Sequence, residues 1–450
     1  MAKLTSRQVC FDARLAASIF FPQFAALACD VDQSHTPAVL RKIVRAATDH
    51  GYEAASKSLE TLAELFVSPK QCQRIAIRIG NERISEQDER VKDYLKLTIP
   101  AQQHGQPTNA PRNDWNGRVA VVYADGGRAQ IRDDLWGKEK PKDKKHRWWR
   151  ESQCGVLQTI LSTPGLIDPH PDVPTELQDP LWIVPKIKEI HRQRTAPSES
   201  DETSSQDPAS HRVPEPKVGQ EKEDSRWSGG DPLVKTVIAT RKGYDQLGLS
   251  MATEAYRRGF NQATSKAFLG DGLKVNWTIW SRHFSHYIPI TDLMHALSYV
   301  YTAAISIHGQ IEDGWKQYLQ WLELVWRGKV TDVVLQMKSF ITAEGKVAED
   351  LKAAITYLTN NAERMKYDEH RTKGLPITTS RVESTQKQIN HRVKGTEKFW
   401  RDESLEPLLQ LISDDLSETH DREEFWQRRQ TRFRGYRTRK PRVKVGSCDS

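Results

Sequence analysis

Three acidic residues, far apart in the chain, have the types and local surroundings of metal ligands. Asp125 follows the apolar run Val119–Tyr123, and Asp271 follows a second short apolar run. Glu383 stands at the start of a polar, basic segment that follows Leu375-Pro376-Ile377. Carboxylate oxygens are preferred ligands of hard cations, and two Mg²⁺ ions about 4 Å apart can promote phosphodiester cleavage. The three acids together indicate a Mg²⁺ (or Mn²⁺) centre of the nuclease or transposase kind.

Each acid also has an ordinary structural explanation. Asp125 precedes Gly126-Gly127, and Asp271 lies between Gly270 and Gly272. Asp-Gly pairs commonly mark turns, and a glutamate in a polar helix is often only solvated. Taken singly, each residue favours this explanation, so the metal hypothesis depends on the set of three.

Four further residues lie near these acids in the sequence. Asp292 competes with Asp271 for the second ligand position, and His295 follows one helical turn later, beside the site or simply packed. Lys387 and Asn390 fall on the same helical face as Glu383. They are candidates to hold a DNA end by charge and hydrogen bonds, whereas a solvated helix face is the alternative.

The elements around the acids predict a mixed α/β domain. Residues 119–123 suit a buried strand, which Asp125-Gly126-Gly127 would end, with 128–132 returning as its antiparallel partner and 148–160 adding a third strand. The later residues alternate between helices and strands, with helices at 244–260 and 277–284, strands at 266–269 and 286–290, and a helix from 291 to 305. Residues 315–365 predict a helical insertion.

The first hundred residues look helical and include a candidate helix-turn-helix at 52–80. Ser68 and Pro69 fit the N-cap and first position of its second helix, which would present Lys70, Arg74 and Arg78 to DNA. Any pair of packed helices would give the same pattern, so DNA recognition and simple packing both remain open.

The overall composition favours a polyanionic partner. The 450 residues contain 67 Lys and Arg against 59 Asp and Glu, a net charge of +8. No apolar stretch reaches the length of a membrane span, including residues 15–29, which Pro22 and Gln23 interrupt. The five cysteines form no CxxC pair, which fits a reducing cytoplasm rather than a disulfide framework or a structural zinc site.

Three segments of biased composition complete the chain. Residues 196–231 hold nine acids against four Lys or Arg and few large apolar residues, which predicts a disordered insertion. Lys138–Arg150 holds seven Lys or Arg and predicts either a solvated loop or a phosphate contact. The tail from 428 to 444 holds nine Lys or Arg and no acid, which favours DNA contact, with Arg428, Arg432, Arg434 and Arg437 as candidates.

Several of these motifs together resemble the DDE transposases of bacterial insertion sequences. The resemblance covers about 118–415 apart from the acidic insertion, and its late part is the most specific. It rests on Asp125-Gly126, Gly270-Asp271-Gly272 with Trp277 and Trp280, Asp292 with His295, Arg364-Met365-Lys366-Tyr367, Gly374 to Ile377, Val382-Glu383-Ser384, and Arg392 to Gly395 with Trp400. Thr379-Ser380-Arg381 departs from the small Ser-Gly pair expected before the glutamate.

The resemblance implies an RNase H-like catalytic domain, with Asp125, Asp271 and Glu383 as the metal-binding and catalytic triad. It favours Asp271 over Asp292, because the second acid of this fold follows the fourth strand. The implied domains are a helical DNA-binding region (1–110), a catalytic core (118–162 and 234–306), a largely disordered insertion (163–233), a helical insertion (307–372), the segment of the last catalytic helix (373–415) and a basic tail (416–450).

The implied reaction is Mg²⁺-dependent hydrolysis at transposon ends, followed by strand transfer into target DNA. The implied partner is double-stranded DNA, bound by a homo-oligomer in the bacterial cytoplasm and associated with the nucleoid. The alternatives are a DNA-binding protein without catalysis, such as a decayed element, and a cellular RNase H-like nuclease.

Overall fold

The computed structural model of the chain describes residues 35–107, 115–132, 149–194, 227, 229–308, 311–341, 345–395 and 398–435. The described residues form two compact units. One contains residues up to Arg83 together with those from Thr419 onward, and the other runs from Ile84 to Glu418. The first unit therefore ends before the predicted limit of 110 and includes part of the predicted tail.

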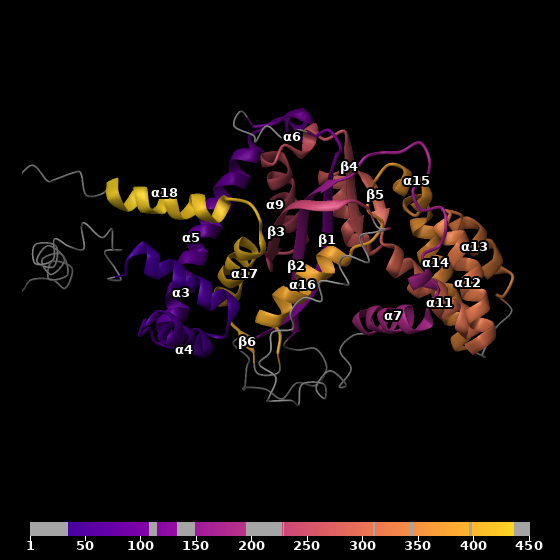
Figure 1. Cartoon of the computed structure of the whole chain (residues 1–450), viewed down its shortest axis with the longest axis horizontal. Coiled ribbons are helices and arrows are strands. Elements are labelled where there is room, and N and C mark those ends of the chain that lie inside the picture. Colours follow the sequence, from indigo (N-terminus) through magenta and orange to yellow (C-terminus); the bar gives the residue numbers. More distant parts are fainter. Residues whose placement is uncertain are drawn as a thin grey trace, which may run out of the picture. The chain divides into compact units, whose positions relative to one another are not determined.

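The larger unit is built on a mixed sheet with helices on both faces (Figure 1), so the predicted α/β class is confirmed. The strand order is β3-β2-β1-β4-β5, with β6 pairing with the far end of β1. β1, β2 and β3 are antiparallel, whereas β4 runs parallel to β1 and β5 parallel to β4. The strands are β1 (Arg118–Ile131), β2 (Trp149–Leu161), β3 (Asp231–Thr240), β4 (Ser265–Gly270), β5 (Ile288–Thr291) and β6 (Phe399–Trp400).

The first strand differs from the prediction, because no hairpin forms after Asp125. β1 continues through the two glycines to Ile131, and Gly126 and Gly127 pair with Gln153 and Ser152 of β2. Neither glycine has a positive φ, so the turn that an Asp-Gly pair often marks is absent here. Asp125 therefore lies within a strand rather than at its end, and the third antiparallel strand is β3, far along the chain.

The two faces of β1 contact different helices. Ala120, Val122 and Ala124 pack in a core with residues of α9 (Tyr244–Arg257) and α10 (Lys274–His283). Side chains alternate along a strand, so Val121, Tyr123 and Asp125 point to the opposite face. On that face lies α16 (Ser380–Val393), which packs against β1 and β2 (Figure 1). The alternation thus turns Asp125 toward the helix that bears Glu383.

The remaining predictions for this unit are largely confirmed. β4 lies where the sequence places it. α9 ends three residues earlier than predicted, α10 begins three residues earlier, and β5 begins two residues later. The helical insertion is also present, and Leu351, Ala354 and Leu358 are buried on one face of its last long helix. The helices after β5 are α11 (Leu293–His308), α12 (Ile311–Trp326), α13 (Val330–Lys338), α14 (Lys346–Asn361), α15 (Tyr367–Thr372) and, after α16, α17 (Asp402–Leu416).

The segment predicted as a largely disordered insertion, 163–233, has structure at both ends. It contains the short helix η1 (Thr175–Gln178), then α7 (Pro180–Arg194), and the start of β3. Ile183, Ile187 and Ile190 are buried along α7, which packs against α11. The prediction is wrong for these residues because their apolar spacing of four and three defines a helix face. Most of the acidic stretch, residues 195–226 and 228, lies outside the described residues.

The smaller unit contains the candidate helix-turn-helix. Its helices are α3 (Pro37–Asp49), α4 (Tyr52–Ala63) and α5 (Pro69–Leu95), of which α5 extends past Arg83. The predicted start of α5 is confirmed, because the Ser68 hydroxyl accepts the Gln71 amide at 3.3 Å and Pro69 is the first helical residue. α4 ends at Ala63. Ala55 and Leu59 are its buried residues, whereas Leu62 and Phe66 are both 83% exposed.

The predicted basic tail begins as a helix. α18 (Asp421–Gly435) buries Phe425 and Trp426, and Arg429, only 3% exposed, donates to Glu82 at 2.7 Å within the smaller unit. This end of the tail is therefore packed protein rather than a free basic extension. Among the described residues, no helix has the length and apolar character needed to cross a membrane.

The glycine of the Gly374–Ile377 motif ends α15 in a left-handed conformation, with φ of 68°. The Gly374 amide donates to the Arg371 carbonyl and the Leu375 amide to the His370 carbonyl, each at 2.9 Å, the pattern of a Schellman C-cap. A Cβ at this position would lie 2.5 Å from the Ser162 hydroxyl oxygen. Only glycine fits this backbone and this space.

We therefore expect Gly374→Ala to lower the free energy of unfolding by about 1–3 kcal/mol. The measurement is urea denaturation followed by circular dichroism. Gly395→Ala is the matched control, because its Cβ would meet only Lys398 methylenes at 3.3 Å and no positive φ is required. Equal stability of the two variants would contradict the cap assignment.

Candidate metal centre

Three aspartates reach the same level of the sheet on adjacent parallel strands. Tyr123 of β1 pairs with Leu269 of β4, and Leu269 pairs with Ile290 of β5. Asp125, Asp271 and Asp292 each lie two residues beyond one member of this row. Because parallel strands advance in step, the three residues come to one region of the sheet edge. The sheet thereby brings together residues that are far apart in the sequence, since Asp271 follows Asp125 by 146 positions (271 − 125) and Asp292 follows Asp271 by 21 (292 − 271).

Glu383 is brought to this region by the close approach of α16 to β1. A Cβ on Gly127 would lie 2.1 Å from the side-chain amide nitrogen of Gln386, so the end of this α16 side chain occupies the space that a side chain at residue 127 would fill. Glu383 lies one turn before Gln386, and its Oε1 accepts the Thr379 hydroxyl at 3.0 Å. This approach, rather than a turn, explains the second glycine after Asp125.

Charges from three elements meet at Asp125. Burial raises the pKa of this carboxyl, and the negative charges of Glu383 and Asp271 raise it further, to about 7. The amide of Gly126 donates to Asp125 Oδ1 at 2.7 Å and opposes the shift. The acids that the sequence analysis grouped therefore lie close enough to repel one another. Such an arrangement of like charges favours a bound cation.

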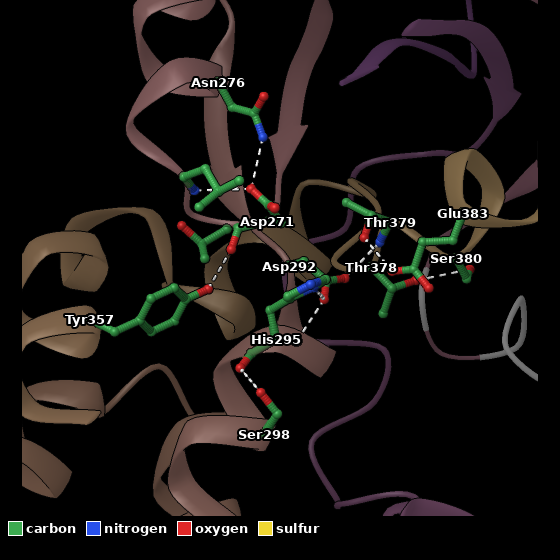
Figure 2. A network of polar contacts seen from close by, with 12 residues as sticks. Asp271, Asn276, Asp292, His295, Ser298, Tyr357, Thr378, Thr379, Ser380 and Glu383 are labelled. Atoms are coloured by element: carbon green, nitrogen blue, oxygen red, sulfur yellow. Dashed lines mark hydrogen bonds and ion pairs between the residues drawn. The ribbon is translucent and has the colours of Figure 1, made fainter. Parts of the chain in front are cut away.

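Asp271 is held by its own loop. Its Oδ1 accepts the Leu273 amide at 2.9 Å and the Asn276 side-chain amide at 2.8 Å (Figure 2). The Tyr357 hydroxyl donates to the Asp271 carbonyl at 2.8 Å, which joins this loop to α14. The carboxylate is thus oriented by one oxygen, and its other oxygen accepts no hydrogen bond from the described residues.

Asp292 has a different environment, because it is fully buried and both of its oxygens accept hydrogen bonds. Oδ2 accepts the His295 amide at 2.7 Å and faces His295 Nδ1 at 2.8 Å, while Oδ1 accepts the Thr379 amide at 2.7 Å (Figure 2). Burial raises the pKa of Asp292, but the hydrogen bonds and charge of His295, together with the Thr379 amide, outweigh it and hold the pKa below its usual value.

His295 lies between acids. Burial lowers the pKa of its imidazole, but the hydrogen bond and charge of Asp292, together with Asp271 and Glu383, raise it to about 9. Burial also raises the pKa of Glu383, and the charge of Asp292 adds to this effect. Ligand atoms of Asp292, His295 and Glu383 lie within 4.8 Å of one another. With N–H donors already on both Asp292 oxygens, this trio fits a hydrogen-bonded ion pair better than a cation site.

Among the described residues, the one group of ligand atoms within 4.8 Å is that of Asp292, His295 and Glu383, but charge also couples three carboxylates, Asp125, Asp271 and Glu383. Each has one oxygen fixed by a hydrogen bond from its own segment, and the second accepts none from the described residues. Oxygen donors of this kind suit Mg²⁺ or Mn²⁺. Their mutual repulsion, expressed in the raised pKa of Asp125, is what a bound cation would relieve.

The two predicted DNA-contacting residues of α16 differ in exposure, since Lys387 is exposed and Asn390 is half-buried. Lys387 is exposed and forms an ion pair with Glu189 of α7 at 3.0 Å, yet its charge still lowers the pKa of Glu383. Asn390 accepts a hydrogen bond from Gln386 at 3.0 Å and lies near Gly127. Lys387 can therefore turn to a DNA phosphate. To do so it must break its exposed ion pair with Glu189, which contributes little to stability.

The other predicted DNA contacts belong to the smaller unit. Lys70 and Arg74 are exposed on α5, and Lys70 donates to Gln73 at 3.0 Å. Arg78 on the same helix is partly buried. Arg428 pairs with Glu424 at 3.2 Å on α18. The side chains of Arg432 and Arg434, and the whole of Arg437 and of residues 133–148, lie outside the described part of the chain.

Two residues important to this site were missed by sequence reasoning. Arg381 donates to Gln158 Oε1 at 3.1 Å and to the Gly230 carbonyl at 2.7 Å, and so anchors the first turn of α16 to β2 and to the start of β3. Thr379 supplies both the amide bound by Asp292 and the hydroxyl bound by Glu383. Both lie in the Thr379-Ser380-Arg381 departure, which was the signal that could have identified them.

The sequence matches no model of a protein family and no curated protein significantly.

Proposed function

We propose that this chain is a DDE-type DNA transposase with an RNase H-like catalytic domain. The observation that carries the proposal is the convergence of Asp125, Asp271 and Glu383 from two parallel strands and one helix. The order of three antiparallel strands followed by alternating helices and parallel strands also agrees with an RNase H-like domain. Asp271 follows the fourth strand, where the resemblance places the second acid.

In this proposal Asp125, Asp271 and Glu383 hold Mg²⁺ or Mn²⁺. When bound, such a cation activates a water or hydroxyl nucleophile and offsets the charge of the leaving oxygen. The chain's own groups orient the ligands: Asn276 fixes Asp271, and Thr379 fixes Glu383. The substrate is double-stranded DNA, cut at the element's ends to expose 3′-hydroxyls that then attack target DNA.

Lys387, Lys70 and Arg74 are exposed cations that would neutralise DNA phosphates in this reaction. Arg78 and Arg428 are lesser candidates, since Arg78 is partly buried and Arg428 already pairs with Glu424. Binding through such contacts weakens steeply as salt rises. The proposal includes a homo-oligomer on DNA, since two ends must be joined to one target, and a location at the bacterial nucleoid.

The test uses purified full-length chain and linear DNA carrying the sequences that flank its coding region. With Mg²⁺ we expect strand cleavage that exposes a 3′-hydroxyl, followed by joining of that end to a supercoiled plasmid, and neither product in EDTA. Binding without cleavage would identify a DNA-binding protein without catalysis. Cleavage without joining would identify a nuclease.

A further inference from the structure

Asp292 has the position of a metal ligand but the contacts of a structural anchor. It stands in the same row as Asp125 and Asp271, at the end of the parallel strand beside β4. Yet it is 0% exposed, and three N–H groups face its two oxygens. The contrast with Asp271, which remains partly exposed with one oxygen not engaged by the described residues, calls for a different role.

One half of the Asp292 carboxylate fixes α11. Leu293 is the first residue of this helix, so Asp292 occupies the N-cap position. Its Oδ2 accepts the amide of His295, the third helical residue, at 2.7 Å, as an N-cap side chain does. The same oxygen holds the imidazole through Nδ1. Asp292 therefore fixes both the helix start and the ring of His295.

The other half fixes the start of the Glu383 helix. Asp292 Oδ1 accepts the Thr379 amide at 2.7 Å, and beside it the Leu293 amide donates to the Ile377 carbonyl at 2.9 Å. The Thr379 hydroxyl in turn donates to Glu383 Oε1 at 3.0 Å. A continuous series of hydrogen bonds thus runs from the sheet, through Asp292 and Thr379, to Glu383 (Figure 2).

We propose that Asp292 is a positioning residue rather than a metal ligand, and that it sets Glu383 opposite Asp125 and Asp271 by binding the Thr379 amide. The inference rests on the proposed function for its catalytic consequence. Its structural part, the fixing of the first turn of α16, stands independently. Partners that orient metal ligands in this way typically contribute 10–100-fold to metal affinity or activity.

The first experiment replaces Asp271 and Asp292, one at a time, with cysteine. It compares the activity of each variant with Mg²⁺ and with Mn²⁺ in the DNA cleavage assay. Thiolate is a softer ligand that binds Mn²⁺ better than Mg²⁺. We expect Asp271→Cys to be inactive with Mg²⁺ and to regain activity with Mn²⁺, whereas Asp292→Cys regains none. Recovery of Asp292→Cys by Mn²⁺ to the same degree would overturn the inference.

The conservative variant separates positioning from ligation. In Asp292→Asn the side-chain oxygen can still accept the Thr379 amide. We therefore expect kcat for cleavage to fall only about 10–100-fold. Asp271→Asn, by contrast, should remove cleavage altogether. Asp350→Asn is the control, because Asp350 also binds α11, through the Ser306 hydroxyl at 2.6 Å, but far along that helix. Loss of cleavage in Asp292→Asn as complete as in Asp271→Asn would contradict the inference.

The second experiment does not depend on activity. Amide hydrogen exchange in the metal-free protein should become at least about tenfold faster at 379–383 in Asp292→Ala, with residues 267–269 of β4 unchanged. Unchanged exchange at 379–383 would overturn the inference even if the chain proves to be a transposase. Faster exchange in a chain that does not cleave DNA would support the positioning role while the proposed function fails.

Discussion

Asp125→Asn is expected to abolish metal-dependent DNA cleavage and at the same time to stabilise the metal-free protein. Loss of a ligand carboxylate removes several kcal/mol of transition-state stabilisation, a decrease on the order of 10³-fold or more in kcat. The second effect follows from the raised pKa of Asp125, about 7 against an ordinary value of 3.8. One substitution should thus move activity and stability in opposite directions.

The sign of the stability effect follows from proton binding. The folded state holds the Asp125 proton more tightly than the unfolded state, so the wild-type protein loses stability as the pH rises from about 4 to about 7. Above pH 7 the ionised carboxylate costs on the order of 2–4 kcal/mol. Asparagine does not ionise, so Asp125→Asn should exceed the wild type by this amount at pH 8 and match it near pH 4.

The measurement is urea denaturation at pH 4.5 and pH 8 in EDTA, with Asp332→Asn, an exposed substitution on α13, as the control. Adding Mg²⁺ at pH 8 should stabilise the wild type, since a ligand that binds only the folded state raises its stability, and should have less effect on Asp125→Asn. A variant that is less stable than the wild type at pH 8 would contradict the repulsion among the three acids.

Asp168→Ala is expected to destabilise the larger unit by about 3–5 kcal/mol, because it leaves a buried cation without its partner. The Arg371 guanidinium is only 3% exposed and donates to Asp168 Oδ1 at 3.0 Å. It also donates to the Trp326 carbonyl at 3.0 Å and stacks 3.9 Å above the Trp326 ring. These contacts join the loop after β2 to α12 and α15, just before the segment that leads to Glu383.

The same ion pair predicts acid sensitivity. Burial raises the pKa of Asp168, but the hydrogen bonds from Arg371 and the His170 amide, together with the charge of Arg371, outweigh it and lower the pKa below the ordinary value of 3.8. The pair therefore stabilises the fold above about pH 4, and this contribution is lost as the pH falls through the lowered pKa. Asp168→Ala should show a correspondingly smaller loss of stability on acidification.

Urea denaturation at pH 7 measures the effect, and two further variants calibrate it. Glu189→Ala removes the exposed Lys387–Glu189 pair and should cost no more than about 1 kcal/mol. The double variant Asp168→Leu with Arg371→Met removes both charges and should recover much of the loss. If Asp168→Ala and Glu189→Ala had equal effects, Arg371 would not depend on Asp168 for its burial.

The parts of the fold that the sequence predicted are those set by local pattern. β4 is a short apolar strand closed by Gly270, and α10 follows with its Trp-bearing face, so neighbours along the chain determine both. The same holds for the start of α5, where Ser68 and Pro69 act within a single turn. In both cases the deciding contacts lie within a few residues of one another.

The errors arose where distant segments decide the structure. Gly126 and Gly127 resemble a turn, but pairing with β2 keeps them extended and α16 uses the space above Gly127. The anchoring role of Asp292 depends on the Thr379 amide, 87 residues away (379 − 292). α7 is an exception, because the local spacing of Ile183, Ile187 and Ile190 is enough to predict it, although an acidic stretch follows.

The close contact between Gly127 and Gln386 has a consequence for related chains. The Gln386 side chain of α16 occupies the space that a side chain at Gly127 of β1 would need, so the sizes of these two residues are linked. A larger residue at position 127 requires the end of the Gln386 side chain to move aside, or a shorter residue at position 386. These two positions should therefore covary among homologues, and the pair is a sequence signature of how deeply the last carboxylate sits over the sheet.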